Sequence, residues 1–135
     1  METNTFMIAV VIEDNPTSAD IICRQFNALG FSETHVSGTA EGGMELVQRV
    51  RPNLVIVDER LPDASGTELV RALRIFDPNL VVAMCTVIDD EETIQEAFEA
   101  GCNYYIVKPN GLRRLCDERN SPSAMLDVGS QVIFR

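Results

Sequence analysis

The sequence predicts a doubly wound α/β fold, in which a flavodoxin-like five-stranded parallel sheet is covered by helices on both faces. Five short apolar runs alternate with segments of helical period, as in repeated strand–helix units. Except for the second, the strands are almost continuously apolar, which is typical of a sheet buried on both sides. The five units occupy about 110 residues, whereas a closed barrel of such units needs about 250.

The first two units are predicted from their apolar runs and helix signals. The first strand is "FMIAVVI" (6–12), and its helix begins near Pro16 and ends at Gly30, where a C-cap belongs. The second strand, "THVSG" (34–38), is weak. Its helix, "TAEGGMELVQRV" (39–50), carries two glycines in its first turns, which lower its helix propensity.

Three more strands continue the alternation. They are "LVIV" (54–57), "LVVAMCTV" (80–87) and "YYIVK" (104–108). One helix between them starts at about Ser65, and the next is "DEETIQEAFEA" (90–100). The acidic first turn of the latter helix complements the positive end of its dipole. These elements complete the five predicted units.

The pattern weakens after the fifth strand. "GLRRLCDER" (111–119) predicts a short or atypical last helix, because Pro122 cannot continue it. The segment 120–135 has no strong period. We expect residues 1–119 to form the domain and 120–135 to be a tail or the start of a linker.

Composition excludes several classes of function. The net charge is −10, so direct binding to nucleic acid or to an anionic membrane is not expected. The four cysteines form no Cys-x-x-Cys pair, which gives neither a usual zinc site nor a disulfide framework. No apolar run reaches the ~20 residues that span a bilayer, and the N-terminus does not resemble a signal peptide. We therefore expect a soluble, cytoplasmic protein.

Polar side chains stand at the ends of four of the five predicted strands. They are Glu13, Asp14, Asp58, Thr86 and Lys108. Because ligands bind at the carboxyl ends of the strands in an open parallel sheet, these side chains should converge at one edge. A carboxylate in such a place can be a simple helix cap, but Asp58 lies well before the helix expected near Ser65.

The chemistry of this set points to phosphoryl transfer. Clustered carboxylates repel one another unless a cation compensates, and oxygen ligands suit Mg²⁺. A carboxylate beside Mg²⁺ can attack phosphorus and form an acyl phosphate, while the metal neutralises phosphoryl charge. The Lys108 ammonium and the Thr86 hydroxyl can then contact further phosphoryl oxygens. Asp58 is the candidate nucleophile.

At these residues the chain resembles the receiver domain of two-component response regulators, the CheY-like superfamily. The matching signatures are "VVIEDNP", "VDERLPDASG", Thr86 at the end of the fourth strand, and "YYIVKP". They cover residues 6 to about 110 in order. Any one motif is weak, whereas the joint spacing of the four is specific.

The resemblance implies the central chemistry. Asp58 would accept a phosphoryl group from a histidine kinase or a phosphotransfer protein. Mg²⁺ or Mn²⁺ would be the cofactor, held by Glu13, Asp14, Asp58 and the backbone carbonyl of Arg60. The chain would catalyse only its own phosphotransfer and dephosphorylation, so no enzymatic turnover on an external substrate is expected.

The resemblance also implies a switch and two structural residues. Thr86 and Lys108 would contact the phosphoryl group. Tyr105 matches the aromatic residue that turns inward when Thr86 is drawn toward the phosphate. Pro109 matches a cis-proline setting, and Gly66 marks the start of the helix beyond the metal-binding loop. The output partner would be a domain or protein outside this chain, and homodimer formation stays open.

Two positions depart from the family's pattern near the site. Val87 follows Thr86 where a small residue is frequent, and Arg60 is a long cation two residues after Asp58. We expect both to tune phosphorylation and dephosphorylation rates. The short last helix also departs from the long closing helix with which the family usually forms its output surface.

Two rival functions remain at the level of sequence. A degenerate receiver could act as a binding module that does not depend on phosphorylation. An Asp-nucleophile phosphohydrolase is less favoured, because such enzymes typically carry a second acid where Arg60 stands here.

Overall fold

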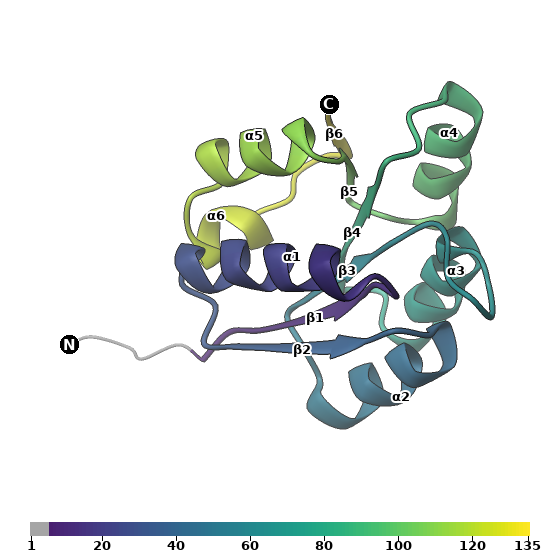
Figure 1. Ribbon diagram of the computed structural model, residues 1–135, viewed down its shortest axis with the longest axis horizontal. Coiled ribbons are helices and arrows are strands. Elements are labelled where there is room, and N and C mark those ends of the chain that lie inside the picture. The colour runs from purple at the N-terminus through teal and green to yellow at the C-terminus, as the bar shows by residue number, and fades with distance from the viewer. Residues whose placement is uncertain (1–5) are drawn as a thin grey trace.

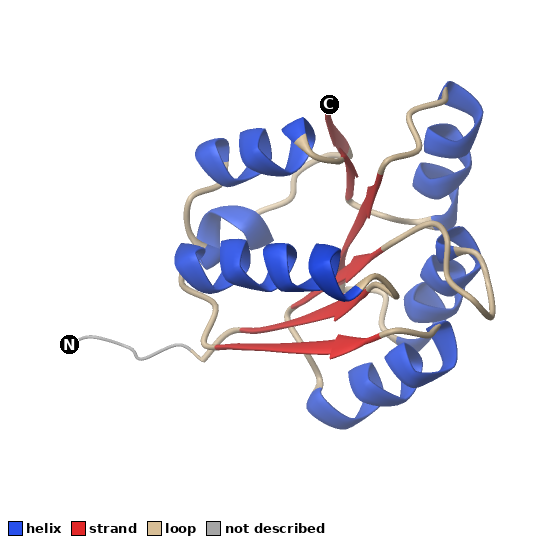
Figure 2. Cartoon of the chain, viewed as in Figure 1, coloured by secondary structure: helices blue, strands red, loops and turns tan. Residues whose placement is uncertain are grey.

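The computed structural model describes residues 6–135 and contains one sheet of six parallel strands (Figures 1 and 2). The strands are β1 (Ile8–Ile12), β2 (Glu33–Ser37), β3 (Leu54–Val57), β4 (Val81–Thr86), β5 (Tyr104–Val107) and β6 (Val132–Phe134). The helices are α1 (Pro16–Leu29), α2 (Ala40–Val50), α3 (Gly66–Phe76), α4 (Glu91–Ala100), α5 (Asn110–Glu118) and α6 (Pro122–Leu126). The strand order is β2-β1-β3-β4-β5-β6.

Helices cover both faces of the sheet, as the continuous apolar strands predict. One core cluster joins the sheet to α2, α3 and α4, and the other joins it to α1, α5 and α6 (Figure 1). Every residue of β3 and β4 is buried. The doubly wound parallel fold is therefore confirmed. None of the described helices is long and apolar enough to cross a membrane.

The helix boundaries follow the capping signals. Gly30 ends α1 with a φ of 117°, a left-handed conformation that favours glycine. Ser65 is the N-cap of α3, and its Oγ accepts a 3.1 Å hydrogen bond from the Glu68 amide. Asp58 thus does not cap this helix, and the capping interpretation of that carboxylate is wrong.

The C-terminal segment corrects the predicted number of strands from five to six. The last helix of the five repeated units, α5, is short, as expected, and Pro122 starts the separate helix α6. The chain then returns along β5, and the Val132 amide donates a 3.0 Å hydrogen bond to the carbonyl of Asn103. The resulting strand, β6, has only three residues, too few to show a period in the sequence.

Candidate functional site

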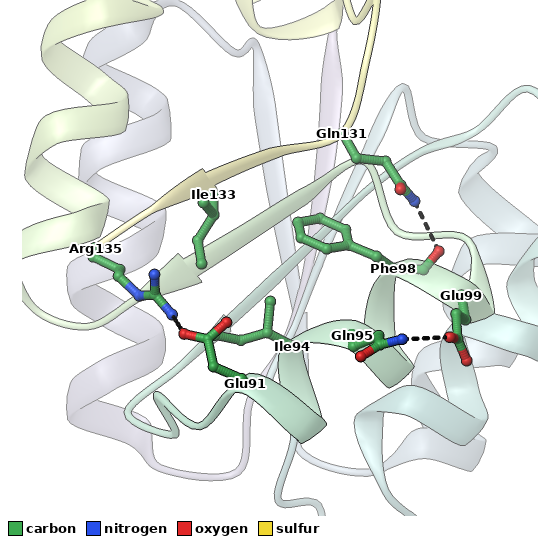
Figure 3. Close-up of a pocket in the computed structure, with 8 residues that line it drawn as sticks. All are labelled: Glu91, Ile94, Gln95, Phe98, Glu99, Gln131, Ile133 and Arg135. Carbon is green, nitrogen blue, oxygen red and sulfur yellow. Dashed lines mark hydrogen bonds and ion pairs between the residues drawn. The ribbon is translucent and has the colours of Figure 1, made fainter.

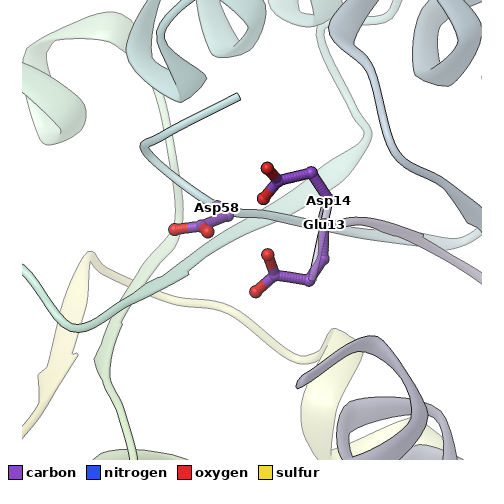
Figure 4. Close-up of side chains that lie close together, drawn as sticks. All are labelled: Glu13, Asp14 and Asp58. Carbon is purple, nitrogen blue, oxygen red and sulfur yellow. The ribbon is translucent and has the colours of Figure 1, made fainter. Parts of the chain in front are cut away.

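Three carboxylates meet at the carboxyl ends of β1 and β3. Glu13, Asp14 and Asp58 each offer an oxygen, and these oxygens lie within 4.8 Å of one another (Figure 4). The sheet sets this geometry, because the Asp58 amide bonds the Ile12 carbonyl at 3.0 Å and extends the β1–β3 ladder by one step. The predicted convergence of the acidic residues is present in the structure.

The loop after Asp58 is folded tightly back against its own start. A Cβ atom at Gly66 would lie 2.2 Å from the Asp58 carbonyl oxygen, so this approach requires glycine. The Glu59 carboxylate accepts hydrogen bonds from the Thr67 amide at 2.8 Å and the Thr67 hydroxyl at 2.7 Å. The backbone of Arg60 pairs with that of Ser65. Gly66 begins α3, as predicted, and the loop positions Asp58.

The Lys108 side chain reaches the site from the end of β5. Its Nζ donates to Oε1 of Glu13 at 2.6 Å and to Oγ of Ser18 at 2.9 Å. The Lys108–Pro109 peptide is cis, in agreement with the prediction for Pro109. Sequence reasoning missed Ser18, and the available signal was its place one helical turn after Asp14, on the first turn of α1.

The pKa values of Asp58, Glu13 and Lys108 shift in different directions. Burial raises the pKa of Asp58, and the adjacent Glu13 carboxylate raises it further, against the positive charge of Lys108. Burial also acts to raise the pKa of Glu13, but hydrogen bonds from Lys108 and the Asn15 amide outweigh it and lower that pKa. Although burial opposes its charge, the Glu13 hydrogen bond and the charge of Asp58 raise the pKa of Lys108. Glu13 is therefore the ionised partner of the lysine, and Asp58 is an unusually basic carboxylate.

Thr86 and Tyr105 are linked through one residue, Ile88. Thr86 is 1% exposed, and its Oγ1 accepts a hydrogen bond from the Ile88 amide at 3.4 Å. Tyr105 is fully buried, and its hydroxyl donates a 2.8 Å hydrogen bond to the Ile88 carbonyl. The two predicted switch residues thus hold the same loop, between β4 and α4.

A groove of about 850 Å³ gives access to the site from solvent. The α1 residues Ile21 and Gln25 line one wall, and Arg60 and Val87 also border it. Val87 is 65% exposed, so this apolar side chain stands in the open mouth of the groove. Both residues that depart from the family's pattern therefore border the access route to Asp58.

Asp63 is a second residue that sequence reasoning missed. Its carboxylate accepts hydrogen bonds from the amides of Ala40 at 2.8 Å and Glu41 at 3.0 Å, the first two residues of α2. These bonds lower the pKa of Asp63. They join the loop after Asp58 to the neighbouring helix, and no local pattern reveals a contact between segments so far apart in sequence.

The carboxylate set fits a small divalent cation. Mg²⁺ binds oxygen ligands at about 2.1 Å, so the ligands of one ion lie only a few ångströms apart. Glu13, Asp14 and Asp58 each place one oxygen within 4.8 Å of the other two. All donors are oxygens, which Mg²⁺ and Mn²⁺ prefer. Glu13, Asp14 and Asp58 could therefore hold such an ion, and the carbonyl of Arg60 stays a predicted fourth ligand.

Known proteins are similar in sequence to this chain over most of its length. The family model for the response regulator receiver domain matches residues 9–119. The DNA-binding response regulator MtrA of Mycolicibacterium smegmatis is 28% identical over 128 residues, which cover 89% of this chain and 55% of MtrA. The chain thus spans about half the length of that relative. Sporulation initiation phosphotransferase F of Bacillus subtilis is 24% identical over 108 residues, covering 80% of this chain and 86% of that protein.

A solved structure confirms the fold independently. The receiver domain protein of Methanospirillum hungatei JF-1, described as CheY-like, superposes with a TM-score of 0.76 at 26% identity. The superposition covers 84% of this chain and 90% of that one. Together with the match over residues 9–119, these findings show that the chain belongs to the response regulator receiver domain family.

Proposed function

We propose that the chain is a phosphorylation-activated receiver whose phosphoacceptor is Asp58. The observation that carries this proposal is the meeting of Glu13, Asp14 and Asp58 at one edge of the sheet, with the Lys108 ammonium beside them. The raised pKa of Asp58 makes its carboxylate more basic and thus a better nucleophile when ionised.

The reaction requires one bond to form and one to break. A carboxylate oxygen of Asp58 attacks the phosphorus of a phosphohistidine, and an O–P bond forms as the N–P bond breaks. The electron pair stays on the imidazole nitrogen, which leaves neutral because the other ring nitrogen keeps its proton. Hydrolysis follows when water attacks the same phosphorus, which regenerates the carboxylate and releases inorganic phosphate.

The other residues of the site act on charge and position. A bound Mg²⁺ or Mn²⁺ would neutralise negative charge on the carboxylates and the phosphoryl group. With such an ion beside Glu13, Lys108 would be free to turn from Glu13 toward a phosphoryl oxygen. Thr86 can offer its hydroxyl hydrogen to another oxygen, since its oxygen lone pair accepts from Ile88. A movement of Thr86 toward the phosphoryl group would be transmitted to Tyr105 through Ile88, which both residues contact.

The relatives support the reaction class and the kind of partner. The Bacillus subtilis relative is named a phosphotransferase and matches this chain over 86% of its own length. A histidine kinase or a phosphotransfer protein is therefore the proposed donor, and the output is a separate domain or protein. MtrA is named as DNA-binding, and this chain matches 55% of its length, so DNA binding is not carried over. No turnover on an external substrate is proposed.

Incubation with acetyl phosphate and Mg²⁺, followed by intact-protein mass, tests the proposal. The wild-type chain should gain one phosphoryl group, whereas Asp58→Asn, and wild type with EDTA, should gain none. No gain in wild type would contradict the proposal and favour the rival, a binding module that acts without phosphorylation. Release of phosphate in large excess over protein from a phosphate monoester, in place of acetyl phosphate, would instead indicate the phosphohydrolase.

A further inference from the structure

Residues 131–135 occupy the sheet edge that β5 would otherwise leave open. β6 pairs with β5 in parallel register, and Ile133 lies opposite Tyr105. Side chains alternate across the sheet, so Ile133 packs with the cluster on the α4 side and Phe134 with the cluster on the α5 side. The segment thus extends both halves of the core.

The segment is attached to both ends of α4 (Figure 3). At the end of the helix, the Gln131 side-chain amide donates to the carbonyls of Phe98 at 2.7 Å and Cys102 at 3.0 Å. At its start, the Arg135 guanidinium pairs with Asp89 at 2.8 Å and also with Glu91. These contacts satisfy carbonyls at the helix C-terminus and add a cation among acidic residues, so both favour the docked segment.

On the other side, the segment is packed directly against α5. A Cβ atom at Gly111 would lie 2.1 Å from the carbonyl oxygen of Phe134, so only glycine permits this backbone approach. Arg114 also donates a 2.8 Å hydrogen bond to the carbonyl of Arg135. The strand is therefore held against α5 on one side and against α4 on the other.

The docked segment and the phosphorylation site share one loop, residues 87–90, between β4 and α4. Thr86 and Tyr105 both bond to Ile88, and the next residue, Asp89, pairs with Arg135. The Tyr105 ring lies edge-on to Phe98, with ring centres 6.3 Å apart, and the Phe98 carbonyl accepts from Gln131. Tyr105 is thus enclosed by elements that the segment holds in place.

We propose that residues 131–135 are an internal clamp on the α4–β5–α5 surface, which keeps Tyr105 buried and bonded to Ile88. If phosphorylation of Asp58 draws Thr86 inward, it favours the same arrangement of the loop. Docking of the clamp and phosphorylation must then favour one another to the same extent, since coupling between two sites is reciprocal. The clamp stands on the contacts above, and its link to phosphorylation rests on the proposed function. A protein partner that binds the α4–β5–α5 surface therefore contacts β6, and Tyr105 stays covered.

The test compares the 135-residue chain with Gln131→Ala/Arg135→Gln, which removes the attachments to α4 and leaves the core residues unchanged. Arg71→Gln, at an exposed position of α3, is the matched control. The protein is labelled with 3-fluorotyrosine, and its two tyrosines give two ¹⁹F resonances that Tyr104→Phe assigns. Without any phosphoryl analogue, the Tyr105 resonance should move or split in the double variant only.

Titration with Mg²⁺ and beryllofluoride, an analogue of the phosphoryl group, then tests the link. The double variant should need at least about fivefold more beryllofluoride for half-saturation, the lower end of usual coupling between sites. An unchanged Tyr105 resonance in the double variant overturns the clamp. A shifted resonance with unchanged or tighter beryllofluoride binding overturns the link to phosphorylation. If wild type neither binds beryllofluoride nor gains a phosphoryl group, the proposed function and the link both fail, while the first resonance comparison still decides the clamp.

Discussion

Lys108, the only lysine of the chain, donates a 2.6 Å hydrogen bond to Glu13 rather than forming an ion pair with Asp58. The Lys108 side chain is 15% exposed and that of Glu13 is 2% exposed. In the unphosphorylated chain the lysine therefore compensates the more buried carboxylate, and Asp58 remains the basic member of the cluster.

Removal of this lysine should leave Glu13 buried without its partner. We expect Lys108→Met to lower the free energy of unfolding at neutral pH by roughly 3 kcal/mol, as for other broken buried ion pairs. The double variant Glu13→Gln/Lys108→Met should recover a large part of that loss. Because the pKa of Glu13 is lowered in the fold, the cost of Lys108→Met should shrink as pH falls and Glu13 protonates. Urea unfolding of the four proteins in a double-mutant cycle measures this, and additive effects would contradict the pairing.

Asp58 should destabilise the fold at neutral pH. Its pKa is raised in the folded chain, so its ionised form opposes folding, and the penalty disappears below the pKa of the unfolded state. Asp58→Asn should raise the unfolding free energy at pH 7 by about 1 kcal/mol, the Coulomb energy of two unit charges about 4 Å apart in water. The gain should vanish in acid. Glu45→Gln, on the exposed face of α2, is the control and should change stability by less than about 0.5 kcal/mol.

Ser18 should hold the lysine on the α1 side of the site. A hydrogen bond from a charged donor contributes about 1.5–3 kcal/mol, so its loss should be visible at the ammonium itself. With ¹⁵N-lysine labelling, the single ammonium signal belongs to Lys108. Its protons should exchange with water roughly tenfold faster in Ser18→Ala. Ser18→Thr keeps the hydroxyl and should restore slow exchange, whereas equal rates in wild type and Ser18→Ala would argue against this role.

The two residues at the groove mouth should set the lifetime and formation rate of the acyl phosphate. Val87→Ala should shorten the lifetime several-fold, because it removes an apolar side chain that limits the approach of water. Arg60→Met should slow phosphorylation by the anion acetyl phosphate, and added salt should reduce the difference, since salt screens electrostatic steering. Time courses of intact mass after donor removal and after donor addition measure the two rates. Unchanged rates in both variants would exclude the proposed tuning.

Much of the site could be predicted because all strands of a parallel sheet have their carboxyl ends at the same edge. Apolar strands end at Glu13 and Asp58, and the ladder places both ends at one edge of the sheet. Ser65 and Gly66 also mark the start of α3 in the sequence itself. These features depend on neighbouring residues and leave a local signature.

The remaining features depend on contacts between distant segments. Ser18 and Asp63 are ordinary polar residues until the fold brings Lys108 and the start of α2 beside them. β6 is too short for a period, and its place is set by Gly111 and by contacts with α4. Apart from the place of Ser18 one helical turn after Asp14, the sequence contains no local signal for these pairings.

The most direct test of the central claim identifies the phosphorylated residue. The chain is treated with acetyl phosphate and Mg²⁺ and then with sodium borohydride, which reduces an aspartyl phosphate to homoserine. Peptide mass analysis should place homoserine at Asp58, and only when both acetyl phosphate and Mg²⁺ are present. Reduction at Asp14 in place of Asp58, or no reduction in fully phosphorylated protein, would contradict Asp58 as the phosphoacceptor.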